Sequence, residues 1–93
     1  MKETTIQTLH PEASKKNKVI SLEKYEMIKS AILEILQNKN LTHTELMQAI
    51  YDLLQADFKG NTHWYGETVK LDLEARKIIK RDTAKPPRYS LWG

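Results

Sequence analysis

The strongest chemical bias in this sequence is a group of cations at its C-terminal end. Residues 76–93 carry six Lys or Arg against Asp82, a net charge of +5, whereas residues 41–75 sum to −4 and the whole chain to +3. The cations nearest the Lys85-Pro86-Pro87 turn are Lys80, Arg81, Lys85 and Arg88. Such asymmetry indicates an anionic partner, although a solvated pair of basic strands would have the same composition.

Other residue types that carry chemistry are present but not in useful arrangements. His10, His43 and His63 lack the spacing of metal ligands. Asp72 and Glu74 lie two apart on a predicted helix, so they do not face each other as an acid–base pair would. The chain has no cysteine, which excludes disulfides and thiolate metal sites. We therefore expect no enzyme activity, no cofactor and no metal.

The elements that must position the cations begin with two helices. Apolar residues recur at helical spacing over 22–37, after Ser21 as N-cap, and the run from Gln37 to Asn40 ends the helix. Thr42-His43-Thr44-Glu45 fits the capping-box pattern and opens a second helix that extends to residue 54.

A third helix and a pair of strands complete the predicted domain. The helix is expected over 63–76 with Thr62 as its cap, and the strands over 78–81 and 88–92 with a six-residue tip. Residues 1–20 show no sustained period and are predicted to form an arm or a disordered tail. The predicted fold is mainly α with a small β-hairpin, a domain over 21–93 preceded by an arm over 1–20.

Three helices followed by a hairpin is the element order of a winged helix-turn-helix domain. The segment from Leu73 to Arg81 resembles the end of the recognition helix and the first wing strand of winged-helix regulators. Thr42 to Leu46 resembles the start of their second helix, and Pro87 to Leu91 the returning wing strand. The whole chain is also similar to a small family of uncharacterised, mainly bacterial, winged-helix-like proteins. The resemblance implies a helix in the major groove and a wing on phosphates.

The sequence departs from that resemblance at two places. Lys77 stands where winged-helix regulators usually have Gly, and a positive φ at Lys77 would cost on the order of 1 kcal/mol. The connection between the second and third helices is also longer than the usual tight turn of this motif. The angle of the third helix is therefore open.

The third helix carries two different faces. Gly66, Val69 and Leu73 form the stripe expected to pack on the other helices. The opposite side holds Trp64, Thr68, Leu71 and Ala75. Three interpretations of this second stripe remain open: a dimer or partner interface, a surface covered by Ile6 or Leu9 of the arm, or the core itself.

These observations lead to one functional hypothesis and an alternative. The first is a nucleic-acid-binding module for double-stranded DNA, a regulator or accessory factor, with Lys80, Arg81, Lys85 and Arg88 on phosphates and Thr68 and Lys70 as helix contacts. The alternative is a protein-interaction or homodimerisation module without DNA binding, with Trp64 and Leu71 at its interface. No run resembles a signal peptide or a membrane span, so we expect a cytoplasmic protein without a membrane partner.

Overall fold

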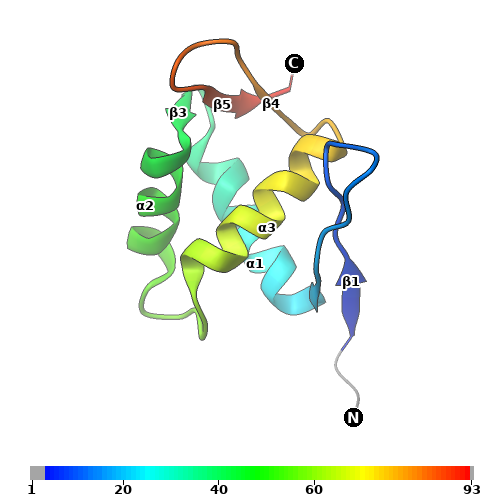
Figure 1. The fold of residues 1–93 in the computed structure, drawn as a ribbon. Coiled ribbons are helices and arrows are strands. Elements are labelled where there is room, and N and C mark those ends of the chain that lie inside the picture. The colour runs from blue at the N-terminus through cyan, green and yellow to red at the C-terminus, as the bar shows by residue number, and fades with distance from the viewer. Residues whose placement is uncertain (1–3, 93) are drawn as a thin grey trace.

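Three helices and two small antiparallel sheets make up the part of the chain that the structure, a computed structural model, describes, residues 4–92 (Figure 1). The helices are α1 (Leu22–Ile35), α2 (His43–Leu54) and α3 (Thr62–Ala75). The strands are β1 (Thr5–Gln7), β2 (Val19–Ser21), β3 (Leu41–Thr42), β4 (Ile79–Arg81) and β5 (Arg88–Leu91). The predicted mixture of three helices and a C-terminal hairpin is thereby confirmed as a small α+β domain.

The starts of α1 and α2 follow from local capping. The side chain of Ser21 accepts a hydrogen bond from the backbone N–H of Lys24, and Thr42 accepts one from Glu45. The Glu45 carboxylate in turn accepts a hydrogen bond from the N–H of Thr42, so both hydrogen bonds of the predicted capping box are present. Beyond α1, Asn38 has a φ of 58°, a left-handed conformation that Asn tolerates and that turns the chain towards β3.

Helix α3 begins one residue earlier than the sequence predicts. Asn61, not Thr62, is its N-cap, and the Asn61 side chain accepts a hydrogen bond from the N–H of Trp64. Both residue types can cap a helix, so the pattern did not distinguish them. The predicted core stripe is confirmed, since Gly66, Val69 and Leu73 are buried. At Gly66, α3 and α2 approach so closely that a Cβ atom would lie 2.9 Å from Met47 Sδ.

A three-stranded sheet lies over one end of the helices, with strand order β3-β5-β4 (Figure 1). Strands β4 and β5 pair antiparallel with Lys80 opposite Ser90, close to the predicted hairpin, and residues 82–87 form its tip. Strand β3 is absent from the sequence prediction. It has two residues, and Leu41 pairs with Tyr89.

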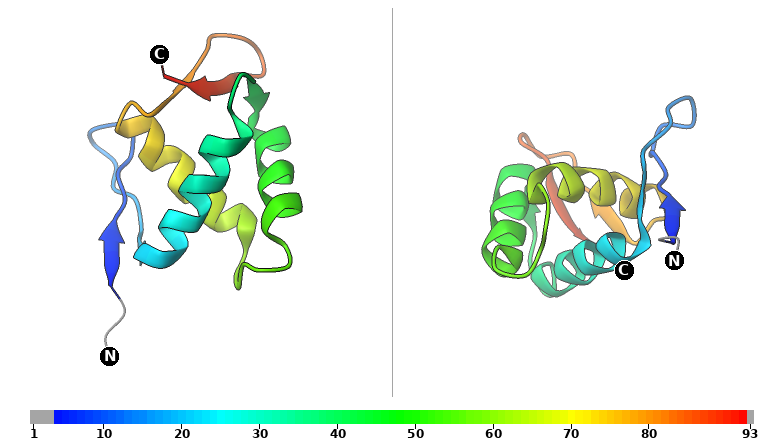
Figure 2. Two further views of the ribbon diagram at one scale, coloured as in Figure 1. Left: turned by 180° about the vertical axis from the view of Figure 1, so that it is seen from behind. Right: turned by 90° about the horizontal axis from the view of Figure 1, so that it is seen from below.

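The N-terminal segment, predicted as an arm or a disordered tail, is a second hairpin. Strands β1 and β2 pair antiparallel with Ile6 opposite Ile20, and Ile20 belongs to the hydrophobic core. The hairpin lies beside α1 and α3 in both side views (Figures 1 and 2). This N-terminal hairpin, residues 5–21, is therefore packed on the same core as the helices.

The core lies where the three helices and the C-terminal hairpin meet. Its fully buried side chains include Ile28, Ile32, Leu46, Ile50, Val69, Leu73 and Ile79. Phe58, in the α2–α3 connection, is also buried. None of the helices within residues 4–92 is long and apolar enough to cross a membrane.

Candidate nucleic-acid interface

The C-terminal hairpin, residues 79–91, presents its cations to solvent. Lys80, Arg81, Lys85 and Arg88 are all exposed. Within residues 4–92, no carboxylate lies within ion-pairing distance of Lys80, Arg81 or Lys85. Their charges are therefore not neutralised by near neighbours and are available to an anion.

The tip of this hairpin is held by one carboxylate. Asp82 Oδ1 accepts hydrogen bonds from the N–H of Arg88 at 2.9 Å and the N–H of Ala84 at 3.0 Å. These bonds, the one from Arg88 first, lower the pKa of Asp82, because they stabilise the ionised carboxylate. Asp82, the single acid among the basic residues, thus fixes the shape of the tip by accepting hydrogen bonds from backbone N–H groups.

Arg88 differs from the other three cations because it has partners within the chain. Its Nη1 lies 3.3 Å from Asn40 Oδ1 and 3.8 Å from a carboxylate oxygen of Glu45. Since Glu45 also completes the capping box of α2, Arg88 ties β5 to the start of that helix. Part of the Arg88 charge is therefore balanced by groups within the protein.

Thr68 and Lys70, the two helix contacts that the sequence suggests, lie inside the protein. Thr68 is 5% exposed, and its hydroxyl donates to the backbone oxygen of Trp64. Lys70 is 6% exposed. Both residues are therefore buried, unlike the exposed cations of the C-terminal hairpin.

Lys70 is held between α2 and β5. Its Nζ lies 3.0 Å from His43 Nδ1 and donates to the hydroxyl of Tyr89 at 3.1 Å. The ammonium also lies 4.2 Å from the centre of the Tyr89 ring. Burial, followed by the Lys70 charge, lowers the pKa of His43, which favours the neutral imidazole that can accept from Lys70. Lys70 thus links three elements.

The remaining outer side of α3 is apolar and acidic. Trp64 is 43% exposed and packs edge-to-face on Tyr65, with ring centres 4.8 Å apart. Leu71 is half-buried and Glu67 is exposed. The interpretation of the whole stripe as core is wrong, since Trp64 faces solvent. The N-terminal hairpin covers the stripe only in part, at Thr68 and Ala75, and Leu9, expected to cover it, is itself exposed.

The N-terminal hairpin is attached to α3 through Asp72, a residue whose role the sequence analysis missed. Asp72 has no exposed surface and accepts hydrogen bonds from the hydroxyl of Tyr25, the N–H of Leu9 at 2.8 Å and Arg76 Nε at 2.9 Å. Burial and then the bond to Asp72 raise the pKa of Tyr25, so the phenol remains protonated and donates. Asp72 therefore joins the N-terminal hairpin, α1 and the end of α3.

A local signal for part of this cluster is present in the sequence. Asp72 and Arg76 are spaced i,i+4, the separation at which helix residues pair on one face. The partners from Leu9 and Tyr25 are far away in the chain, so spacing alone does not reveal them. The cluster is structural, and within residues 4–92 no group of three or more His, Asp or Glu is placed to hold a metal ion.

Comparison with known proteins gives a family without a known role. Residues 5–89 match the family of unknown function DUF6958, and the chain belongs to this family. No curated protein and no solved structure matches the chain. The match covers the N-terminal hairpin, all three helices and β4 and ends within β5, so the N-terminal hairpin is part of what the family shares.

Proposed function

We propose that this chain is a winged-helix module that binds double-stranded DNA through the phosphate backbone. The C-terminal hairpin acts as the wing, and Lys80, Arg81 and Lys85 contact phosphates. The observation that carries the proposal is the exposure of these cations on a hairpin whose tip has a fixed shape, with no carboxylate of residues 4–92 within ion-pairing distance of them. Arg88 assists from the base of the wing.

The fold assignment within this proposal is supported by the strand order. The three-stranded sheet joins the strand that precedes the second helix to the C-terminal hairpin, so the hairpin is fixed to the helical part of the domain. Here β3 directly precedes α2 and pairs with β5, in the order β3-β5-β4. Lys77 adds support, because its φ of 61° occurs where winged-helix regulators usually have Gly.

The surface chemistry favours binding with little sequence preference. Thr68 and Lys70 are buried, and the exposed side of α3 offers Trp64 and Glu67 in place of the Arg, Asn or Gln that read bases. Phosphate contacts position a protein on a duplex but do not read its sequence. The proposed role is an accessory factor or regulator that binds DNA by its backbone.

A titration of a labelled random-sequence duplex by fluorescence anisotropy tests the proposal. We expect binding that weakens as salt rises, with a log–log slope of about −0.9 for each phosphate neutralised. The variant Arg81→Gln/Lys85→Gln should bind more weakly with a slope shallower by about 1 to 2. The matched control Lys29→Gln/Lys59→Gln removes two charges from α1 and the α2–α3 connection and should keep the wild-type slope. Equal slopes for the two variants would sink the proposal.

A second candidate function is a protein-interaction or homodimerisation module. The specific observation that favours it is Trp64, 43% exposed near Glu67 on the helix that a DNA-reading winged helix would place in the major groove. An exposed Trp is a frequent anchor of protein interfaces. This candidate predicts self-association through α3.

A further inference from the structure

We propose that the loop of the N-terminal hairpin, residues 8–18, is a second phosphate-binding limb that contacts the same DNA as the C-terminal hairpin. The inference rests on the proposed function, which it extends to a second site on the opposite side of α3. The loop carries Lys15, Lys16 and Lys18 against one acid, Glu12. All four side chains are exposed.

Hydrogen bonds hold this loop in a fixed shape. Asn17 Nδ2 donates to the backbone oxygen of Leu9 and to that of Thr68 in α3, each at 2.9 Å. Gln7 donates to the backbone oxygen of Asn17, and the N–H of Leu9 donates to buried Asp72. The two ends of the loop are thereby attached to each other and to α3. A loop fixed in this way loses little conformational freedom when it binds a ligand.

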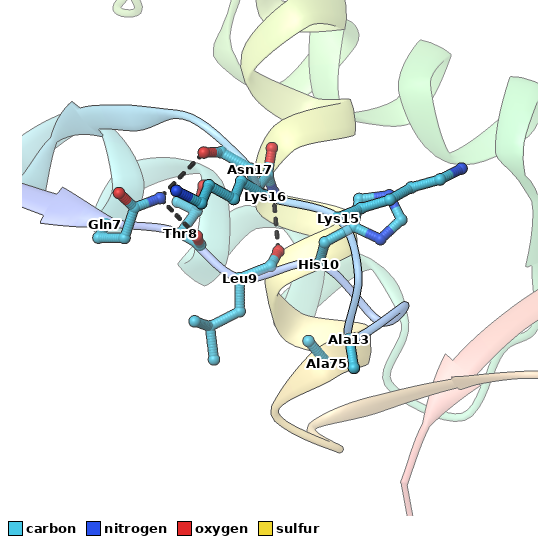
Figure 3. Close-up of a pocket in the computed structure, with 9 residues that line it drawn as sticks. All are labelled: Gln7, Thr8, Leu9, His10, Ala13, Lys15, Lys16, Asn17 and Ala75. Atoms are coloured by element: carbon cyan, nitrogen blue, oxygen red, sulfur yellow. Dashed lines mark hydrogen bonds between the residues drawn. The ribbon is translucent and has the colours of Figure 1, made fainter.

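The loop also encloses a pocket whose lining contains cations and no carboxylate. The pocket has a volume of about 430 Å³ and lies between the loop and Ala75 in the last turn of α3 (Figure 3). Its basic lining residues are His10, Lys15 and Lys16. Backbone and side-chain nitrogens on such a loop suit the oxygens of a phosphate group.

Only part of the charge of this loop is neutralised internally. Lys15 Nζ lies 3.4 Å from Glu12, in an exposed ion pair that contributes little. Lys16 and Lys18 have no ion-pair partner within residues 4–92. Like the unpaired cations of the C-terminal hairpin, these two lysines are therefore available to an anion.

The two hairpins are placed to act together. Viewed from below, the N-terminal loop and the tip of the C-terminal hairpin both project on the α3 side of the molecule, away from α1 (Figure 2, right). Figure 1 shows the C-terminal end of α3 between them. This end continues into exposed Lys77, which adds a positive charge between the two hairpins, whereas the neighbouring Arg76 is paired with Asp72.

This placement accounts for Glu67, the exposed acidic residue of α3. Trp64 and Glu67 lie in the first half of the helix, whereas the N-terminal loop lies beside Ala75 in its last turn and Lys77 follows directly after it. DNA held by both hairpins crosses the C-terminal end of α3 and does not lie along the helix. Glu67 then stays away from the phosphates, which it would repel.

The test compares three double variants in the same anisotropy titration over salt. Lys16→Gln/Lys18→Gln removes the two unpaired loop cations without releasing Glu12 from Lys15. We expect weaker binding and a slope shallower by about 1 to 2, since each lost phosphate contact contributes about 0.9. Arg81→Gln/Lys85→Gln reports on the C-terminal hairpin, and Lys29→Gln/Lys59→Gln is the control. Amide NMR spectra establish that each variant is folded.

The outcomes separate the two proposals. Wild-type slope in the loop variant, together with a shallower slope in the Arg81/Lys85 variant, overturns the second limb and leaves the proposed function standing. A wild-type protein that does not bind duplex at low salt overturns both. Shifts of the amide signals of residues 10–18 on addition of duplex, lost in the loop variant, are the expected confirmation of direct contact.

Discussion

At the scale of single residues, Asp72 shows how one buried side chain connects distant parts of the chain. It joins Leu9 of the N-terminal hairpin, Tyr25 of α1 and Arg76 at the end of α3. A buried carboxylate is stable only when its lone pairs are satisfied by donors such as these. Asp72 therefore contributes to stability and also holds the base of the proposed second limb in position.

We predict that Asp72→Asn destabilises the protein. The new amide group places N–H where an acceptor is required, so at least one donor among the three partners is left without a bond. The free energy of unfolding should fall by on the order of 2 to 3 kcal/mol, as measured by urea denaturation. Asp52→Asn, an exposed carboxylate on α2 that accepts from Gln48, is the control and should change it by less than about 0.5 kcal/mol. An unchanged urea midpoint for Asp72→Asn would contradict the assigned role.

Lys70 and His43 illustrate how residue type alone misleads. A lysine on the third helix of a winged helix is an obvious candidate for a DNA contact, and the sequence analysis treats it so. The structure places its ammonium between His43 and Tyr89, where it contacts a ring and two polar atoms. The periodicity of α3 gives the correct rotation for Val69 and Leu73, but the residues that cover Lys70 come from distant parts of the chain.

At the scale of elements, the sequence predicts those features that depend on residues close together in the chain. The start of α2 is determined by Thr42 and Glu45, three residues apart, and was predicted correctly. The hairpin of β1 and β2 was not predicted, because each strand has three residues, too few for a sustained alternating pattern. Its order depends on contacts such as Leu9 with Asp72, which join residues 63 positions apart. Strand β3, two residues long, is likewise defined by its partner β5.

The junction between α3 and β4 allows a test at this scale. Lys77 has a φ of 61°, a conformation in which the Cβ atom crowds the following carbonyl. We predict that Lys77→Gly raises the free energy of unfolding by on the order of 1 kcal/mol, since glycine has no Cβ atom. Urea denaturation measures the change.

Lys77→Ala is the matched variant for that measurement. It removes the same charge and side chain but keeps the Cβ atom, so it should give no comparable gain. Equal effects of the two substitutions would indicate that the charge of Lys77, and not its backbone conformation, determines the result.

At the scale of the whole molecule, charge and apolar surface are divided between two regions. The exposed cations lie on the two hairpins, and exposed Trp64 lies near the start of α3. The net charge of +3 conceals this division, although the charges of the separate segments indicate part of it. The basic C-terminal hairpin was predicted from sequence, whereas the position of a second basic loop beside α3 can be seen only in the fold.

The second candidate function makes a prediction at this scale. If the outer side of α3 is an interface between two copies, Trp64→Ala or Leu71→Asp should weaken self-association while the fold survives, since Trp64 is exposed and Leu71 half-buried. Sedimentation over a range of concentrations measures the association constant, and circular dichroism monitors the fold. A wild-type chain that remains monomeric at the highest concentrations would exclude this role for α3.

The way Asp82 holds the tip of the C-terminal hairpin has a consequence for how binding strength can vary. Its carboxylate bonds to the backbone N–H groups of Ala84 and Arg88, and the side chains of Arg81 and Lys85 take no part in these bonds. The shape of the tip is therefore independent of the charges it displays. Substitutions at positions 81 and 85 can raise, lower or reverse the attraction for an anion without refolding the loop. The tip is thus a surface on which affinity can evolve, or be engineered, separately from stability.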